Sequence, residues 1–181
     1  GPDARTPLAA CRPRLGTGTE ALARLSMLPT ASPYMGLEVC AGTCKVSLDL
    51  PPALRDLFPD RLKRARRSME RVAACHQGGQ FHEEGGAFQV VLPLMEKRIC
   101  PAAEALFNRL ARQCHAPVLP ATAAKRLRIG PQALKVLESR GLKPSLEIPA
   151  ARHGRRYTLR AFSLSDMDML AQHLARERRR A

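Results

Sequence analysis

The sequence contains no tryptophan and few other aromatic residues. Its 181 residues include 2 Tyr and 5 Phe, so aromatic residues make up 4% of the chain. Proteins that bind single-stranded nucleic acid without sequence preference usually stack the bases on aromatic side chains. We therefore do not expect this chain to offer a stacking platform for single strands.

Long apolar stretches are also absent. The chain has no run of about 18 consecutive apolar residues, the length that a membrane-spanning helix needs. A basic segment followed by an apolar one, as in a secretory leader, is not recognisable either. We therefore expect no membrane partner and a cytoplasmic location.

The cysteines are few and unevenly spread, which does not indicate a disulfide framework and favours a reducing compartment. The six positions are Cys11, Cys40, Cys44, Cys75, Cys100 and Cys114.

Zinc binding is the alternative use for these cysteines. Zinc requires four Cys or His ligands in tetrahedral geometry, usually supplied as two close pairs. Cys40 and Cys44 have an acceptable spacing, but further candidates such as Cys75 and His82 are scattered. Cys44 lies on the apolar side of an expected strand and Cys114 continues an apolar helical stripe, so both resemble small core residues. We expect no bound metal and no cofactor.

A catalytic set of residues is not evident. There is no glycine-rich phosphate loop followed by Lys and Ser or Thr, since the pair Gly85-Gly86 lacks that lysine. Cys75 and His76 are adjacent, so on a helix their side chains point in different directions, a poor geometry for a nucleophile and its base. We therefore do not expect an enzyme.

What the chain has in abundance is positive charge. It holds 30 Lys and Arg against 16 Asp and Glu, a formal net charge of +14. Residues 120–181 hold 14 Lys and Arg against 5 Asp and Glu, a net charge of +9, and residues 1–119 have a net charge of +5. Such an excess favours a polyanionic partner or an acidic membrane surface. With 45% hydrophobic residues, the chain can still bury a core.

Residues 1–119 predict an arm and a small α+β unit. Residues 1–33 are expected to form a flexible arm, because they are rich in Pro and Gly and lack periodicity. Within 34–116, alternation predicts a β-hairpin over 37–50 and a second one over 81–92. Helices are predicted from Asp60, as the cap, to about His76 and from Pro101 to about Cys114. This unit would serve assembly or DNA contact. The basic face of the first helix fits a phosphate backbone or plain solvation equally well.

Two short helices joined by a tight turn are predicted at the start of residues 119–181. Thr122 can cap a first helix over 123–127, and Arg128-Ile129-Gly130 forms the turn. Pro131 is then at the first position of a helix over 131–140, which Gly141 ends. This spacing is that of a helix-turn-helix. Gln132 and Lys135 point outward near the start of the second helix, where such side chains reach base edges in a major groove.

A hairpin and a last helix follow. A strand over 145–148, a turn over 149–154 and a returning strand over 155–162 would form a wing. Ser163-Leu164-Ser165-Asp166 is a Ser-x-x-Asp start signal for a helix. That helix has Met167, Leu170, Ala171 and Leu174 on one stripe.

This segment resembles the winged helix-turn-helix of MerR-type regulators and phage excisionases. The shared features are Ala124, Leu134 and Leu137, Gly141-Leu142, Gly154-Arg155-Arg156-Tyr157, and Ser163 to Asp166. The resemblance covers about a third of the chain. It departs at Arg128, where the family usually has Gly, and in the longer stretch between Gly141 and the wing arginines.

The resemblance implies DNA contacts from Gln132, Lys135, Arg155 and Arg156. With their exposed polar neighbours, the candidate DNA-contacting residues are Lys125, Arg128, Gln132, Lys135, Ser139, Arg152, Arg155 and Arg156.

We therefore predict an α+β, mainly helical protein with a C-terminal winged helix-turn-helix and a smaller N-terminal α+β unit. It is expected to bind specific double-stranded DNA and to act as a dimeric bacterial transcription regulator. One alternative is a recombination, partition or replication accessory factor of a mobile element. Another is an adaptor that uses a winged helix to bind protein or RNA. The structural alternative is a plain helical hairpin with a β-turn, whose basic residues form a solvated face.

Overall fold

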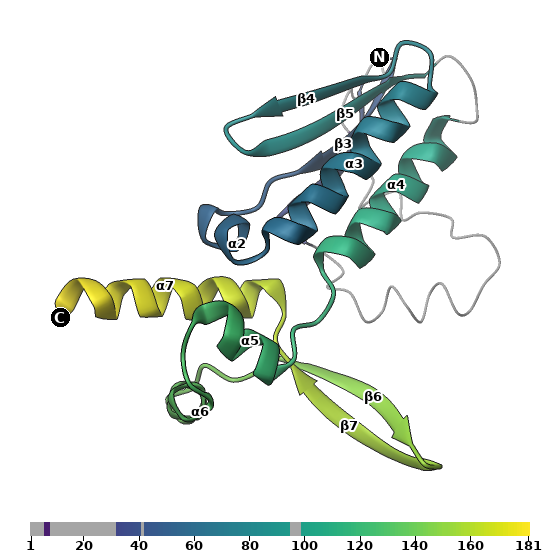
Figure 1. Ribbon diagram of the computed structural model, residues 1–181. Coiled ribbons are helices and arrows are strands. Elements are labelled where there is room, and N and C mark those ends of the chain that lie inside the picture. Colours follow the sequence, from purple (N-terminus) through teal and green to yellow (C-terminus); the bar gives the residue numbers. More distant parts are fainter. Residues whose placement is uncertain (1–5, 8–31, 41, 95–98) are drawn as a thin grey trace. The chain divides into compact units, whose positions relative to one another are not determined.

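A computed structural model describes residues 6–7, 32–40, 42–94 and 99–181 (Figure 1). The described residues form an α+β fold with six helices and two antiparallel sheets. The chain divides into two compact units: residues 1–50 with 60–114 form the first, and residues 51–59 with 115–181 form the second. Most of the arm expected over residues 1–33 lies outside the described residues.

The first unit contains a five-stranded antiparallel sheet in the order β1-β2-β3-β5-β4. Its strands are β1 (Thr6–Pro7), β2 (Met35–Cys40), β3 (Thr43–Leu48), β4 (Gln80–Glu84) and β5 (Ala87–Pro93). Both hairpins predicted from alternation are present, and β3 pairs with β5 to join them. Gly85 and Gly86 have φ of +59° and +84° in the β4–β5 turn, a conformation that glycine favours.

One face of this sheet is apolar and covered by two helices, α3 (Pro59–Cys75) and α4 (Ile99–Cys114) (Figure 1). Burial alternates along β3 and β5, as the period of a strand requires. The buried side chains of the sheet are Leu37, Cys44, Val46, Leu48, Phe88, Val90 and Leu92. The helices contribute Ala65, Met69, Ala73, Ala103, Leu106, Leu110, Ala111 and Cys114.

Two hydrogen bonds join α3 to α4. The Arg61 guanidinium donates to the carbonyl of Cys114 at 2.9 Å, and the Ser68 hydroxyl donates to Gln113 at 3.2 Å. Figure 1 shows that the two helices run in opposite directions, and both hydrogen bonds reach the end of α4. Asp60 was expected to cap α3, but the helix begins one residue earlier at Pro59, so Asp60 lies in its first turn. Proline is well suited to that first position because it lacks an N–H.

The second unit contains α2 (Pro52–Leu57), α5 (Pro120–Leu127), α6 (Pro131–Ser139) and α7 (Leu164–Arg180). A two-stranded sheet of β6 (Leu146–Arg152) and β7 (Arg155–Ala161) projects away from these helices (Figure 1). The helices α2 and α7 pack together. The core consists of Leu54, Phe58, Val118, Ala123, Ala124, Leu127, Leu134, Leu137, Ala161, Phe162, Leu164, Met167 and Leu170.

Two predicted details of this unit are wrong. Thr122 does not cap α5, because the helix begins at Pro120 with Leu119 as its N-cap and no side-chain cap. The turn expected over 149–154 is only His153-Gly154, and β6 continues through Pro149. A proline is compatible with a strand where its nitrogen faces away from the partner strand, as it can in a two-stranded sheet.

Candidate nucleic-acid interface

The outer face of α6 carries polar side chains and one exposed branched apolar residue. Leu134 and Leu137 are buried beneath the helix, so Gln132, Lys135 and Ser139 are left exposed on the other side, as expected. The helix begins with Pro131 after Gly130, whose extended backbone directs the chain into the first turn. Gly141 has a φ of +100°, the left-handed conformation that ends a helix.

Val136 occupies the middle of this exposed face and was missed by sequence reasoning. Its position, four residues after Gln132 and three before Ser139, places it on the same side of the helix. Its side chain is 42% exposed. Val is a common buried residue, so only the spacing could have indicated its outward position. An exposed methyl group between polar neighbours can contact a thymine methyl in a major groove.

Ser139 is exposed but already has a partner. Its hydroxyl donates to the carbonyl of Val136 at 2.6 Å, one turn earlier in the same helix. The serine oxygen can still accept a hydrogen bond. Ser139 is therefore a weaker candidate for base contact than Gln132 or Lys135, whose side chains form no hydrogen bond or ion pair within the described residues.

Lys125 and Arg128 are exposed at the end of α5. Arg128 has φ +56° and ψ +45°, and its backbone N–H donates back to α5. This left-handed conformation is the one that glycine adopts most readily, and a side chain there costs roughly 1–2 kcal/mol. Arg128 thus retains the backbone shape of a glycine turn while adding a positive charge beside α6.

Arg126, between these two residues, has a structural role. Its guanidinium donates to the carbonyl of Leu57 at 3.2 Å and lies 5.7 Å from the ring centre of Phe58. It therefore connects α5 to the segment after α2 within the second unit. A hydrogen bond to a carbonyl and a ring contact hold the charge in place, so Arg126 is unsuited to a ligand role.

The hairpin turns sharply at its tip. His153 and Gly154 have φ of +50° and +75°, so both central residues are left-handed, as in a type I′ turn. This turn matches the twist of the strands and fixes their register, in which Arg152 pairs with Arg155 and Ala151 with Arg156.

The register separates Arg155 and Arg156, both of which the resemblance implies as DNA contacts. Side chains directly opposite each other lie on the same face of a sheet, and neighbours along a strand lie on opposite faces. Arg155 therefore shares a face with Arg152 and with Tyr157, whereas Arg156 lies on the other face. All four side chains are exposed, and Tyr157 is 43% exposed.

A carboxylate joins the hairpin to the start of α7. Asp166 Oδ2 accepts hydrogen bonds from the Ser163 N–H at 2.9 Å and from the N–H and hydroxyl of Ser145 at 3.0 and 2.6 Å. The Ser163 hydroxyl in turn accepts from the Asp166 N–H at 3.0 Å. The predicted capping box is therefore present. It also anchors the segment that leads from α6 into β6.

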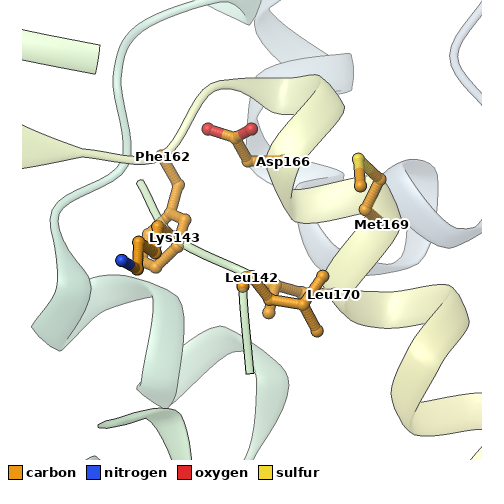
Figure 2. A pocket seen from close by; sticks show the side chains of 7 residues that line it. Leu142, Lys143, Phe162, Asp166, Met169 and Leu170 are labelled. Carbon is orange, nitrogen blue, oxygen red and sulfur yellow. The ribbon is translucent and has the colours of Figure 1, made fainter. Parts of the chain in front are cut away.

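A small hollow lies beside this anchor (Figure 2). Figure 2 shows Leu142, Phe162 and Leu170 near the hollow, with the Asp166 carboxylate directed away from them. Its lining residues are Gly141, Leu142, Lys143, Phe162, Asp166, Met169 and Leu170. Ser145 and Ser163 engage the Oδ2 oxygen of Asp166, and the lining also contains the charged side chain of Lys143.

The described cysteines do not gather. Cys44 and Cys114 are buried and Cys75 is exposed. Burial raises the pKa of the Cys114 thiol to about 12, although the positive charge of Arg61 opposes the shift. Among the described residues, no group of three or more His, Cys, Asp or Glu is arranged to hold a metal ion. In the same part of the chain, no helix is long and apolar enough to cross a bilayer.

No family model, curated protein or solved structure matches this chain. The role of the second unit is therefore inferred from its own residues.

Proposed function

We propose that the second unit is a winged helix-turn-helix that binds a specific sequence in double-stranded DNA, and that the protein is a transcription regulator. The observation that supports this most is the exposed face of α6. It carries Gln132, Lys135 and Val136 on a short helix that follows another short helix through a three-residue turn. This is the arrangement in which a second helix enters a major groove.

The α6 side chains provide complementary base contacts. Gln132 can donate to and accept from an adenine edge, and Lys135 can donate to the acceptors of a guanine. Val136, one turn after Gln132 on the same side of the helix, can meet a thymine methyl. Lys125 and Arg128, at the end of the preceding helix, have the charge and exposure to contact flanking phosphates.

The hairpin supplies affinity through one of its faces. Arg152 and Arg155 are opposite each other, and like charges in that position repel. A phosphate between the two guanidinium groups would remove this repulsion and accept hydrogen bonds from both. Arg156 lies on the other face and would contribute less. This division differs from the original expectation that Arg155 and Arg156 act as a pair.

The proposal is tested by selection from a duplex library with a randomised centre. Recovery of one short sequence, bound at moderate salt in the presence of excess competitor DNA, is the expected result. Recovery of bent sites without a common sequence would favour an accessory factor of recombination or replication. Absence of duplex binding at moderate salt would refute the proposal and favour an adaptor.

A further inference from the structure

The outer surface of the two helices in the first unit is strongly basic, with Glu70 as an exposed carboxylate on α3. Six cationic side chains are exposed there, four on α3 and two on α4. We name this surface the α3–α4 cationic face; its residues are Lys63, Arg64, Arg67, Arg71, Arg109 and Arg112.

The positions of these residues place them on one side. On α3 the buried residues Ala65, Met69 and Ala73 contact the core, and positions 63, 67 and 71 lie about half a turn away from them. On α4 the buried residues include Leu106 and Leu110, and positions 109 and 112 are exposed. The cations therefore point away from the sheet on both helices.

The contact between the helices brings the two groups of cations together. Ser68 and Gln113 are hydrogen-bonded at 3.2 Å, and the helices are antiparallel. Arg64 and Arg71 lie within one turn of Ser68 on α3, and Arg109 lies one turn from Gln113 on α4, so these cations flank the contact between the helices. The six charges thus form one surface across both helices.

These cations differ from others on the same helices. Arg66 forms an ion pair with Glu83 and lies 5.3 Å from the ring centre of Phe88, so it is held against the sheet. Arg61 donates to the Cys114 carbonyl. In the part of the chain that the structure describes, none of the six residues of the cationic face forms an ion pair or hydrogen bond, although the exposed Glu70 lies one turn from Arg67. Glu70 offsets only part of their mutual repulsion, because six cations face this one carboxylate.

The shape and chemistry of the surface favour a phosphate backbone. Lys63, Arg67 and Arg71 follow one another at four-residue steps, so their Cα atoms are about 6 Å apart along the helix and span about 12 Å. A duplex presents a phosphate about every 3.4 Å along each strand, so a row of this kind can meet several phosphates at once.

Other partners fit this surface less well. Protein interfaces and membrane-surface helices need apolar or aromatic anchors. The large hydrophobic residues that are exposed in the described chain, Leu119, Val136, Tyr157 and Met169, all belong to the second unit. The cationic face itself has no such anchor, and no exposed aromatic ring on which a base could stack.

We propose that the α3–α4 cationic face is a second, sequence-independent binding surface for duplex DNA. Together with a sequence-specific second unit, it would allow one chain to hold two duplex segments. The surface lies wholly within the first unit, so this proposal does not depend on how α6 or the hairpin functions.

The test uses the full chain with Arg64, Arg67, Arg71 and Arg109 all changed to Gln. A matched control changes the same four residues to Lys, which keeps the charge and the helix propensity. Circular dichroism and the melting temperature establish that both variants are folded. Both are also made in a background with Lys135→Ala, Arg152→Ala and Arg155→Ala, in which binding by the second unit is weakened.

Two measurements of DNA binding are made on these proteins, and binding to phosphatidylserine vesicles is measured beside them. The first is the salt dependence of binding to a duplex of arbitrary sequence, where each lost phosphate contact lowers the slope of log K against log salt by about 0.9. The second is capture of a labelled duplex by protein held on an immobilised duplex.

We expect the Gln variant to show a smaller salt slope than the parent and to lose capture of the second duplex. The Lys variant should retain the slope and the capture of the parent. Equal slopes and equal capture for the parent and the Gln variant would overturn the proposal. So would a loss confined to binding of phosphatidylserine vesicles, which would assign the surface to a membrane. If the parent shows charge-dependent binding but selects no sequence, the proposed regulator function fails while the cationic face stands.

Discussion

At the scale of single residues, the basic side chains of this protein have different roles. Arg126 holds α5 to the segment after α2, and Arg66 lies against Phe88 and pairs with Glu83. Lys135 and Arg155 are exposed without such partners. Net charge alone therefore overestimates the number of residues that are free to meet a polyanion, and local contacts decide which ones can.

Replacing the polar residues of the α6 face should weaken specific binding. We expect Gln132→Ala and Lys135→Ala each to cost about 1–3 kcal/mol on the selected duplex, with little effect on non-specific duplexes. Fluorescence anisotropy on both duplexes measures this. Lys143→Ala, an exposed lysine beyond the end of α6, is the control and should bind like the parent. Unchanged affinity of both α6 variants would mean that another element contacts the bases.

Val136 gives a separate test of major-groove contact. If its methyl groups meet a thymine methyl, replacing one particular thymine of the selected site by deoxyuridine should weaken binding by about 0.8 kcal/mol, the value of one buried methyl-sized group. The Val136→Ala variant should be insensitive to the same replacement. Equal sensitivity of parent and variant at every thymine would place Val136 outside the interface.

At the scale of elements, strand register determines what the hairpin can do. The sequence Arg155-Arg156 suggests a pair, but successive side chains of a strand point to opposite faces. The type I′ turn at His153-Gly154 fixes which of them faces Arg152. The turn was predicted to be longer than it is, because a proline such as Pro149 often ends a strand.

The hairpin arginines should therefore have unequal effects. We expect Arg155→Ala to lower the salt slope by about 0.9 and the Arg152→Ala/Arg155→Ala double variant to lower it by about 1.8. Arg156→Ala should lower it less, and none should change the sequence preference. The slopes come from titrations at several salt concentrations. An effect of Arg156→Ala as large as that of Arg155→Ala would show that the hairpin does not use a single face.

The capping box provides a stability test of the α7 start. Ser163→Ala removes one acceptor from the helix end and should lower the free energy of unfolding by about 1 kcal/mol. Asp166→Ala also removes the bonds from Ser145 and should cost more, about 2 kcal/mol. Urea denaturation measures both, and Ser165→Ala, an exposed serine in the same turn, should be close to neutral. If Asp166→Ala costs no more than Ser163→Ala, the Ser145 contacts contribute nothing.

At the scale of the whole molecule, the sequence predicted the elements better than their grouping. Period-two alternation, Pro131, Gly141 and the Ser163 to Asp166 box are local signals, and each marks an element that the structure contains. The assignment of residues 51–59 to the second unit could not be predicted in this way. It depends on Leu54 and Phe58 being buried there and on Arg126, about seventy residues later in the chain.

In the candidate site, too, local features could be predicted from the sequence and contacts between distant residues could not. The outward side chains of α6 could be predicted from the helical period, as Gln132 and Lys135 demonstrate. The engagement of Ser139 with its own helix and the separation of Arg155 from Arg156 depend on backbone geometry and strand register. The basic surface across α3 and α4 depends on how two helices, distant in sequence, pack side by side.

The central claim is that α6 reads a major groove, and methylation interference on the selected duplex tests it most directly. Dimethyl sulfate modifies guanine N7 in the major groove and adenine N3 in the minor groove, positions that belong to the two separate edges of the base pairs. We predict that N7 methylation of guanines at the centre of the site prevents binding of the parent protein, and that N3 methylation there has little effect. Interference at adenine N3 alone, or at neither position, would contradict the claim.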